Sequence, residues 1–220
     1  MARLEEHERA LSLRKQGMSY SQIKKILKLS KSTLSVWLKD YPLPKQRIRE
    51  LRDWNEQRIE RYRETMKRKK ERRLEEIYKT QKKDIRLLNK RESFIAGLML
   101  YWGEGTKSRR NSLGISNSDP AVIKFFIYWA TNILAIPKNK IKVQLHLYKD
   151  MNIGEETKYW SNSLRIPRKQ FNLPYIKKTF SKRINHKGSF GHGTCQVRAG
   201  NTLIAEKVFM SIKVISNLYS

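Results

Sequence analysis

The chain opens with three short segments whose apolar residues recur at helical spacing. These segments, LEEHERALSLRKQG, SYSQIKKILKL and SKSTLSVWLKD, occupy residues 4–40. We expect Gly17 to end the first helix, and Ser19 and Ser30 to cap the second and third. The positions expected to be buried are Leu11, Leu13, Ile23, Ile26, Leu27, Leu34 and Trp37. The pattern therefore predicts a compact trihelical domain over residues 1–41.

The third predicted helix offers small polar and basic side chains on its outer side. These are Lys31, Ser32, Thr33, Ser35 and Lys39. Side chains of this kind suit the major groove of DNA, which is where a helix-turn-helix places its second helix. Short trihelical units also act as protein-protein modules. The basic character of the chain favours DNA as the partner of residues 1–41.

A basic segment without internal Gly or Pro follows the break at PLPK. Across residues 42–91 basic residues outnumber acidic ones by about two to one, and many lie three or four positions from an opposite charge. We expect one long helix or two helices in series. The apolar positions are too sparse for a strong coiled-coil seam. The segment is therefore predicted to be a helical linker, either a solvated spacer or one that also lies along phosphates.

Residues 92–220 are richer in apolar residues and mix helical and alternating periods. Helices are predicted at 92–105, 119–134, 154–164 and 202–218, and strands at 111–118, 140–150, 174–180 and 193–200. Asp119 is the expected cap of the second of these helices, and Pro120 its first residue. We interpret the segment as an α+β domain of helices and antiparallel hairpins, with core positions at Trp102, Trp129, Trp160 and Cys195.

The charge of the chain narrows the classes of partner. Lys and Arg total 48 against 20 Asp and Glu, which gives a formal net charge of +28 in 220 residues. Nucleic acids and anionic membranes are the polyanions that suit such a surface. No apolar run approaches the roughly 20 residues that span a bilayer, so we expect no membrane partner. The single cysteine excludes an internal disulfide, and an intracellular protein is the simplest interpretation.

One acidic residue stands out in LYWGEGTK, residues 100–107. Glu104 lies between Gly103 and Gly105 at the predicted end of a helix. Glycine there is common, because it adopts the left-handed capping conformation without strain. A carboxylate is unusual, since the helix dipole places partial negative charge at this end. The local sequence leaves two interpretations, an exposed or ion-paired helix end and a ligand for a cation.

Several segments together resemble a known family. FIAGLMLYWGEG, GISNSDPAVIKFFIYWA, KVQLHLYKD, YWSNSLRIPRKQF and GTCQVRAG resemble the core of a divergent LAGLIDADG homing endonuclease. SYSQIKKILKLSKSTLSVWL resembles the helix-turn-helix of resolvases and of related bacterial and phage regulators. The combination is similar to prokaryotic proteins that join one such helix-turn-helix to one such core. The resemblance implies a cytoplasmic, nucleoid-associated protein of prokaryotic or phage type.

The resemblance also implies roles for residues of the signature helix. In that family two signature helices cross at small residues, and the acids at their ends hold divalent metal between the scissile phosphates. Ala96, Leu100 and Gly103 would form the crossing, and Glu104 would bind Mg²⁺ or Mn²⁺. The core occurs once in this chain, so an active site would require a homodimer with a two-fold axis. No small-molecule cofactor is implied.

Further residues are assigned to the DNA and to the chemistry. Lys107, Lys142, Lys178 and Arg198 are candidates for stabilising charge near the metal. With Lys142, the alternating Gln144 and His146 are expected to face DNA. We interpret His146 as a residue facing DNA or solvent and not as a metal ligand. In HKGSFGHG, His186 and His192 admit a metal site, but a flexible basic loop is the preferred interpretation.

Two functions of different classes follow. The first is a metal-dependent, site-specific endonuclease that cleaves double-stranded DNA. The second is a non-catalytic transcriptional regulator, compatible with a degenerate motif that keeps one acid, a Glu where the family usually has Asp. A third interpretation is an RNA-binding or RNA-processing protein, because charge alone does not distinguish the two nucleic acids.

Overall fold

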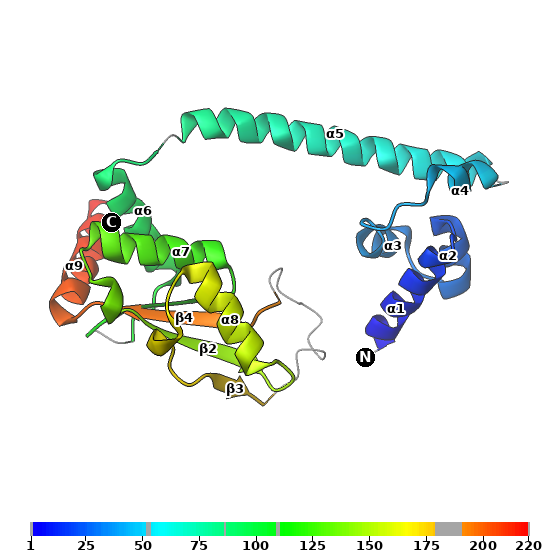
Figure 1. The fold of residues 1–220 in the computed structure, drawn as a ribbon. Coiled ribbons are helices and arrows are strands. Elements are labelled where there is room, and N and C mark those ends of the chain that lie inside the picture. Colours follow the sequence, from blue (N-terminus) through cyan, green and yellow to red (C-terminus); the bar gives the residue numbers. More distant parts are fainter. Residues whose placement is uncertain (1, 52–53, 86, 109–110, 179–190, 220) are drawn as a thin grey trace. The chain divides into compact units, whose positions relative to one another are not determined.

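The chain divides into two compact units, which are described separately. The computed structural model describes residues 2–51, 54–85, 87–108, 111–178 and 191–219. One unit comprises residues 1–86 and the other residues 87–220 (Figure 1). Within the described ranges, no helix combines the length and the apolar character needed to cross a membrane. The protein is α+β, as predicted.

The first unit is entirely helical in its described residues. Its helices are α1 (Ala2–Lys15), α2 (Tyr20–Leu27), α3 (Lys31–Trp37), α4 (Lys45–Glu50) and α5 (Trp54–Asp84). Ser19 and Ser30 cap α2 and α3 as predicted, each accepting a hydrogen bond from the backbone three residues on. The linker therefore forms two helices in series, α4 and α5, which was one of the two predicted alternatives.

The first three helices enclose a small core. Ala10, Tyr20, Ile23, Leu34 and Leu38 are buried together, and a ring of partly buried residues packs around them: Leu11, Leu13, Met18, Leu27, Leu29 and Trp37. The prediction was wrong for Ile26, whose side chain is 46% exposed. Helix α2 has only eight residues, so one apolar side suffices to hold it, and Ile26 lies outside that side.

A buried network of charges fixes the start of α5 to this core. Arg14 donates to both carboxylate oxygens of Glu60, at 3.2 and 3.0 Å, while the backbone N–H of Tyr20 also donates to Glu60. The hydroxyl of Ser19 donates to Glu56 at 2.8 Å. Arg63 stacks over the ring of Tyr20. The first turns of α5 are therefore part of the helical unit and not a free spacer.

The second unit combines helices with one four-stranded sheet. The helices are α6 (Lys90–Glu104), α7 (Pro120–Tyr128), α8 (Ile153–Leu164) and α9 (Thr202–Leu218). The strands are β1 (Leu113–Asn117), β2 (Lys142–Tyr148), β3 (Tyr175–Lys177) and β4 (Thr194–Ala199). Short irregular helical turns lie at Trp129–Ile133, Lys138–Lys140 and Arg168–Gln170. Asp119 caps α7 and Pro120 opens it, as predicted.

The sheet order is β1-β4-β2-β3, which corrects the predicted antiparallel hairpins. Strand β4 pairs antiparallel with both β1 and β2, but β3 runs parallel to β2. Helix α8 lies between β2 and β3 in the sequence, and such a crossover is what a parallel pair requires. The sheet is therefore mixed, and none of its pairs joins consecutive strands through a tight turn.

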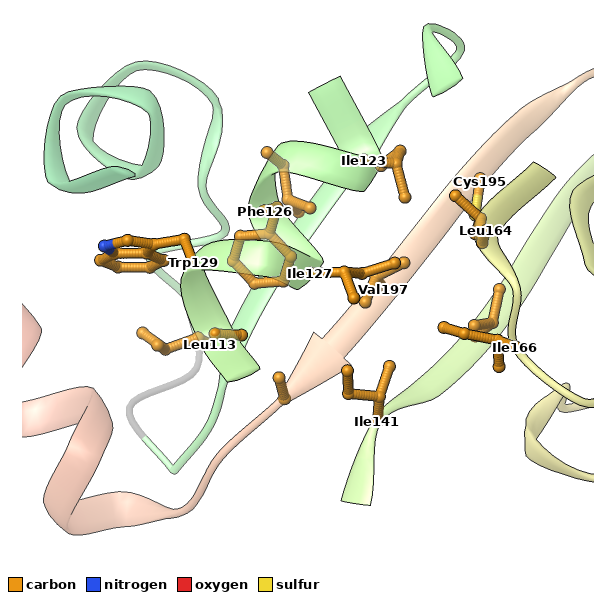
Figure 2. Packing of buried hydrophobic residues seen from close by; sticks show 14 of the residues in the cluster. Leu113, Ile123, Phe126, Ile127, Trp129, Ile141, Leu164, Ile166, Cys195 and Val197 are labelled. Atoms are coloured by element: carbon orange, nitrogen blue, oxygen red, sulfur yellow. The ribbon is translucent and has the colours of Figure 1, made fainter. Parts of the chain in front are cut away.

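The helices cover one face of this sheet and form the core with it. Alternate strand residues are buried beneath them: Leu113, Ile115, Val143, Leu145, Leu147, Cys195, Val197 and Ala199. Figure 2 shows Phe126 and Trp129 packed beside Leu113, with Val197 and Ile141 nearby. Cys195 is buried here, as predicted, and burial raises the pKa of its thiol far above the ordinary value.

A close contact between two helices sets the position of α6. Trp129 begins a π-helical turn after α7, and its indole N–H donates to the carbonyl of Phe94 at 3.2 Å. Its ring occupies the space in which Gly97 has no side chain. Trp129 and Trp160 are fully buried as predicted, whereas Trp102 is 39% exposed and does not belong to the core. Trp102 lies on the side of α6 that faces away from the sheet.

Candidate nucleic-acid interface

The face of the sheet opposite the helices is polar, and no helix of the described residues covers it. Strand residues alternate, so those opposite one another in the register share a face. On the open face the register forms rows that cross the strands. The rows are Gly114–Arg198–Lys142, Ser116–Gln196–Gln144, Thr194–His146–Tyr175 and Tyr148–Lys177. We refer to these residues as the open face.

The first row brings two predicted residues together. Arg198 and Lys142 are direct partners in the β4–β2 register, so two cationic side chains lie side by side. Gly114 lies next to Arg198 on β1, and its missing side chain leaves room for the hydroxyl of Thr106 and the stem of Arg198. This end of the open face is therefore a positive area beside the residues that follow α6.

The second row consists of amide side chains. Arg198 donates to the side-chain oxygen of Gln196 at 3.1 Å, which orients both groups on β4. Gln144 donates through Nε2 to the carbonyl of Leu173 at 3.0 Å. The Gln144 amide oxygen takes no part in that contact and remains an acceptor. Amides at the centre of a sheet face have the donor and acceptor groups that read base edges.

The third and fourth rows add aromatic groups. The rings of His146 and Tyr175 meet edge to face, with centroids 5.5 Å apart. Lys177 lies over the ring of Tyr148, with Nζ 4.5 Å from the centroid. Partial burial, and then the charges of Lys177 and Arg198, lower the pKa of His146 from its ordinary value. His146 is therefore a neutral donor and acceptor near pH 7.

Three hydrogen bonds fix the end of α6 at the edge of the sheet. The N–H of Gly105 donates to the carbonyl of Tyr101 at 2.8 Å, and the Tyr101 hydroxyl donates to the carbonyl of Thr106 at 2.7 Å. The N–H of Thr106 donates to the carbonyl of Gly114 at 2.8 Å. Burial raises the pKa of the Tyr101 hydroxyl. Glu104 is thus held directly before the segment that pairs with β1.

Gly105 differs from a common helix-ending glycine. Its backbone is extended, with φ −71° and ψ 147°, so the left-handed capping conformation is not used. A side chain here would press against the carbonyl and ring of Tyr101. Glycine is required because Gly105 must pass close to Tyr101 to bridge to Ile115 on β1. The reason for glycine is therefore close packing and not backbone strain.

Glu104 itself is exposed to solvent. Among the described residues it enters no ion pair or hydrogen bond, so the ion-paired alternative has no support there. The described part of the chain also contains no cluster of three or more His, Cys, Asp or Glu side chains suited to a metal. A single carboxylate makes a poor site for Mg²⁺, which prefers several oxygen ligands.

The remaining candidate cations lie on different sides of the sheet. Lys107 is exposed and follows Thr106 directly, near the end of α6. Lys178 is exposed and follows β3, the strand at the opposite edge from β1. Three strand spacings, about 14 Å, separate these edges. Within one chain, Lys178 therefore lies at the opposite edge of the sheet from the end of α6, and its proposed role stays a prediction.

The outward side of α6 is apolar and is left exposed by the described residues of the second unit. Ile95, Met99 and Trp102 are 41, 38 and 39% exposed and follow one another at helical spacing. Of the predicted crossing residues, Ala96 and Leu100 are half-buried and Gly103 is exposed. No atom lies within 4 Å of the position that a Gly103 side chain would take. We refer to Ile95, Met99, Trp102 and Gly103 as the α6 outer face.

Helix α3 carries four of the predicted DNA-contacting residues of the first unit, and the fifth, Lys39, lies in the turn that follows it. Lys31, Ser32 and Lys39 are exposed, whereas Thr33 and Ser35 are half-buried. The hydroxyl of Ser30 lies 2.8 Å from the hydroxyls of both Ser32 and Thr33. These two residues therefore serve the cap of the helix as well as its surface. Val36, which was not singled out from the sequence, is 67% exposed on α3.

The histidine-containing loop lies largely outside the described residues. His186 is among those not described, whereas His192 is placed. Its Nδ1 lies 2.8 Å from a carboxylate oxygen of Glu156, and its ring stacks on Tyr159. The carbonyl of His192 accepts from the indole of Trp160 at 2.8 Å. His192 thus attaches the chain before β4 to α8, a structural role that explains it without a metal.

Comparison with known proteins adds no identification. No protein-family model matches the chain, and neither curated proteins nor solved structures give a significant match. The candidate interface therefore rests on the geometry described above.

Sequence reasoning missed several residues of the open face. Gln196 shares the two-residue period of Arg198 on β4, so the alternation of TCQVRA contained that signal. Tyr175 of the open face and Thr106 beside it had no comparable signal. Their positions depend on the bridge from Gly105 to β1 and on the parallel pairing of β3, which are long-range contacts. Local periodicity does not encode either contact.

Proposed function

We propose that this protein binds double-stranded DNA in a sequence-specific manner through the open face of its sheet and through α3. The observation that carries the proposal is the open face itself. It places Arg198 and Lys142, then Gln196 and Gln144, on a surface backed by a fully packed core. Cations bind phosphates and amides read bases, so both kinds of contact are available on a rigid support. The net charge of +28 suits the same partner.

The protein acts on DNA as a homodimer in this proposal. The side chains of Ile95, Met99 and Trp102 are exposed in a row along α6. Covering them with another surface lowers the free energy, because apolar area is removed from water. Gly103 adds a second argument, because a side chain at this position would contact no atom of the described residues, so packing within them does not require glycine there. If a second α6 packs closely against this position, a residue without a side chain is needed there, which accounts for the glycine. A two-fold axis at this point also matches a pseudo-palindromic site.

Cleavage is the enzymatic form of the proposal. A two-fold pair brings together two Glu104 carboxylates, which repel each other unless a cation lies between them. Glu104 from each chain is the residue that would hold Mg²⁺ or Mn²⁺. When bound, such an ion polarises a phosphodiester and lowers the pKa of an attacking water. The protein would then be a site-specific DNA endonuclease.

One observation favours a second candidate, a non-catalytic transcriptional regulator. Within the described residues, Glu104 does not belong to any group of three or more His, Cys, Asp or Glu side chains that could hold a metal ion. Lys178 also lies away from Glu104 at the far edge of the sheet. DNA binding by the open face requires neither a metal nor a nucleophile. The two candidates therefore share their binding surface and differ only in the role of Glu104.

Selection of bound duplexes from a random pool tests the binding proposal. On the selected site, Arg198→Gln is expected to weaken binding by about tenfold, the usual cost of losing one good DNA contact. Lys124→Gln is the matched control, since it removes the same charge from α7, on the covered side of the sheet. Equal effects of the two changes, or failure to select any duplex, would contradict the proposal.

Cleavage of the selected duplex in Mg²⁺ or Mn²⁺ then separates the two candidates. For the endonuclease, Glu104→Gln abolishes cleavage and leaves binding in place. Intact DNA with the unaltered protein in both metals indicates the regulator. Sedimentation of the free protein and of its DNA complex reports whether two chains assemble.

A further inference from the structure

The charges of α5 are segregated by side along the helix. At 100° per residue, a set of exposed cations recurs every three or four positions on one side. They are Arg58, Arg61, Arg68, Lys69, Arg72, Lys79 and Lys83, which we call the basic stripe. Only one carboxylate, Glu76, projects within this side. Glu60, Glu64, Glu71 and Glu75 project from a neighbouring side, so the acids are kept off most of the stripe.

The contacts that anchor α5 leave the stripe uncovered. Glu56 and Glu60 are buried against Arg14, Ser19 and Tyr20. These two acids project away from the basic stripe, because residues 56 and 60 lie roughly 165° and 125° around the helix from its centre. Glu56 and Glu60 therefore hold α5 against the rest of the first unit, and the side chains of the basic stripe are exposed to solvent. Among the described residues, the contacts that anchor α5 to the first unit do not use a row of cations of this length.

Local ion pairs account for little of the stripe. Among the described residues of α5, Lys79 pairs with Glu75 at 2.8 Å and Arg72 pairs with Glu76 at 3.9 Å. All four side chains are more than 60% exposed, and exposed pairs of this kind contribute little free energy. The charges of these two cations thus stay available to an external anion. Stability of the helix does not explain the segregation.

The dimensions of the stripe match duplex DNA. From Arg58 to Lys83 the helix rises about 38 Å, close to one turn of B-DNA. A straight helix of this length can pass across a groove and reach phosphates on both of its strands. The members of the stripe are all Arg or Lys, the side chains that bind phosphates, and the exposed Tyr62 lies beside the stripe.

We propose that α5 is a third DNA-binding element, whose basic stripe contacts the phosphate backbone of duplex DNA without reading its sequence. This inference rests on the proposed function, since it takes duplex DNA as the partner. It assigns a binding surface to a helix that otherwise joins two units. The stripe supplies affinity, whereas α3 and the open face supply the choice of sequence.

A pair of fourfold variants in the full chain tests the proposal. The stripe variant carries Arg68→Gln, Arg72→Gln, Lys79→Gln and Lys83→Gln. The control variant carries Lys67→Gln, Lys70→Gln, Arg73→Gln and Lys82→Gln, which are exposed residues on the other sides of the same helix. Both remove four positive charges and replace them with the same helix-forming residue, so net charge and helix propensity stay matched. Circular dichroism checks that both keep their helix content.

Binding to the selected duplex is measured as a function of salt concentration. The stripe variant is expected to bind at least about tenfold more weakly than the control at physiological salt, with a salt slope smaller by about 3.6 for four lost phosphate contacts. Its preference for the selected sequence over a scrambled one stays unchanged. The assignment is overturned if the two variants lose the same amount of affinity for the selected duplex. It is also overturned if the stripe variant loses affinity for RNA duplexes only.

The same experiment separates this inference from the proposed function. If the unaltered protein binds the selected duplex and Arg198→Gln weakens it, but the stripe variant behaves as its control, only the role of α5 fails. If the unaltered protein selects no duplex, both proposals fail together.

Discussion

A side chain on Gly97 would place its Cβ 2.1 Å from Cδ1 of Trp129, so the two residues are complementary in size. Gly97→Ala is expected to destabilise the second unit by about 1–3 kcal/mol or more, because the buried indole cannot move aside. Denaturant unfolding of the full chain, followed by Trp fluorescence, measures the loss. Gly103→Ala is the control on the same helix.

Gly103→Ala has space for its side chain and improves helix propensity. In the monomer it should leave the free energy of unfolding within about 1 kcal/mol of the original value. If α6 packs against a second α6, however, Gly103→Leu should weaken self-association, since a large side chain keeps the helices apart. Sedimentation across a concentration series tests this. Unchanged association in Gly103→Leu would place the dimer contact elsewhere or exclude it.

The ion pair between Arg14 and Glu60 should be essential to the first unit. Both side chains are at most 5% exposed, so Glu60→Gln leaves a buried guanidinium without its counter-charge. The expected cost is about 3–5 kcal/mol. Hydrogen exchange of α1 and α2 in the full chain measures it locally. Glu50→Gln, which breaks the exposed pair with Arg47, should cost no more than about 1 kcal/mol.

His146 should make stability depend on pH in one direction. Its folded pKa lies below the ordinary value of 6.5, so the unfolded chain takes up this proton first as the pH falls. The contribution of neutral His146 to the free energy of unfolding is therefore fully present above pH 6.5. It is lost as the pH falls from 6.5 toward the folded pKa of His146. The Tm of the unaltered protein should therefore fall more between pH 8 and pH 5.5 than that of His146→Gln. Parallel losses in the two proteins would contradict this account.

The sequence predicted most elements of the fold because their signals are local. Ser19, Ser30 and Asp119 are caps whose hydrogen bonds lie within three residues, and all three form as expected. Strand β2 alternates clearly, which predicted before any pairing was known that Lys142, Gln144 and His146 share one side. That Arg198 lies beside Lys142 on this side follows from the β2–β4 register, which periodicity does not give.

The errors arose where distant parts of the chain meet. Nothing local to YIK indicates that it pairs parallel to β2, so antiparallel hairpins were predicted where the sheet is mixed. Trp102 looked like a core residue because its size favours burial, yet Trp129 fills the place beside α6. The anchoring of α5 depends on Arg14, 46 residues before Glu60, and no spacing rule links them.

The position of β4 has a consequence for how the second unit is made. Strand β4 is the last strand in the sequence, yet it lies between β1 and β2 and is hydrogen-bonded to both. While the chain is being synthesised, β1 and β2 expose unpaired edges until residues 194–199 emerge. The open face, and any affinity that depends on it, therefore comes into existence only after residues 194–199 have been synthesised.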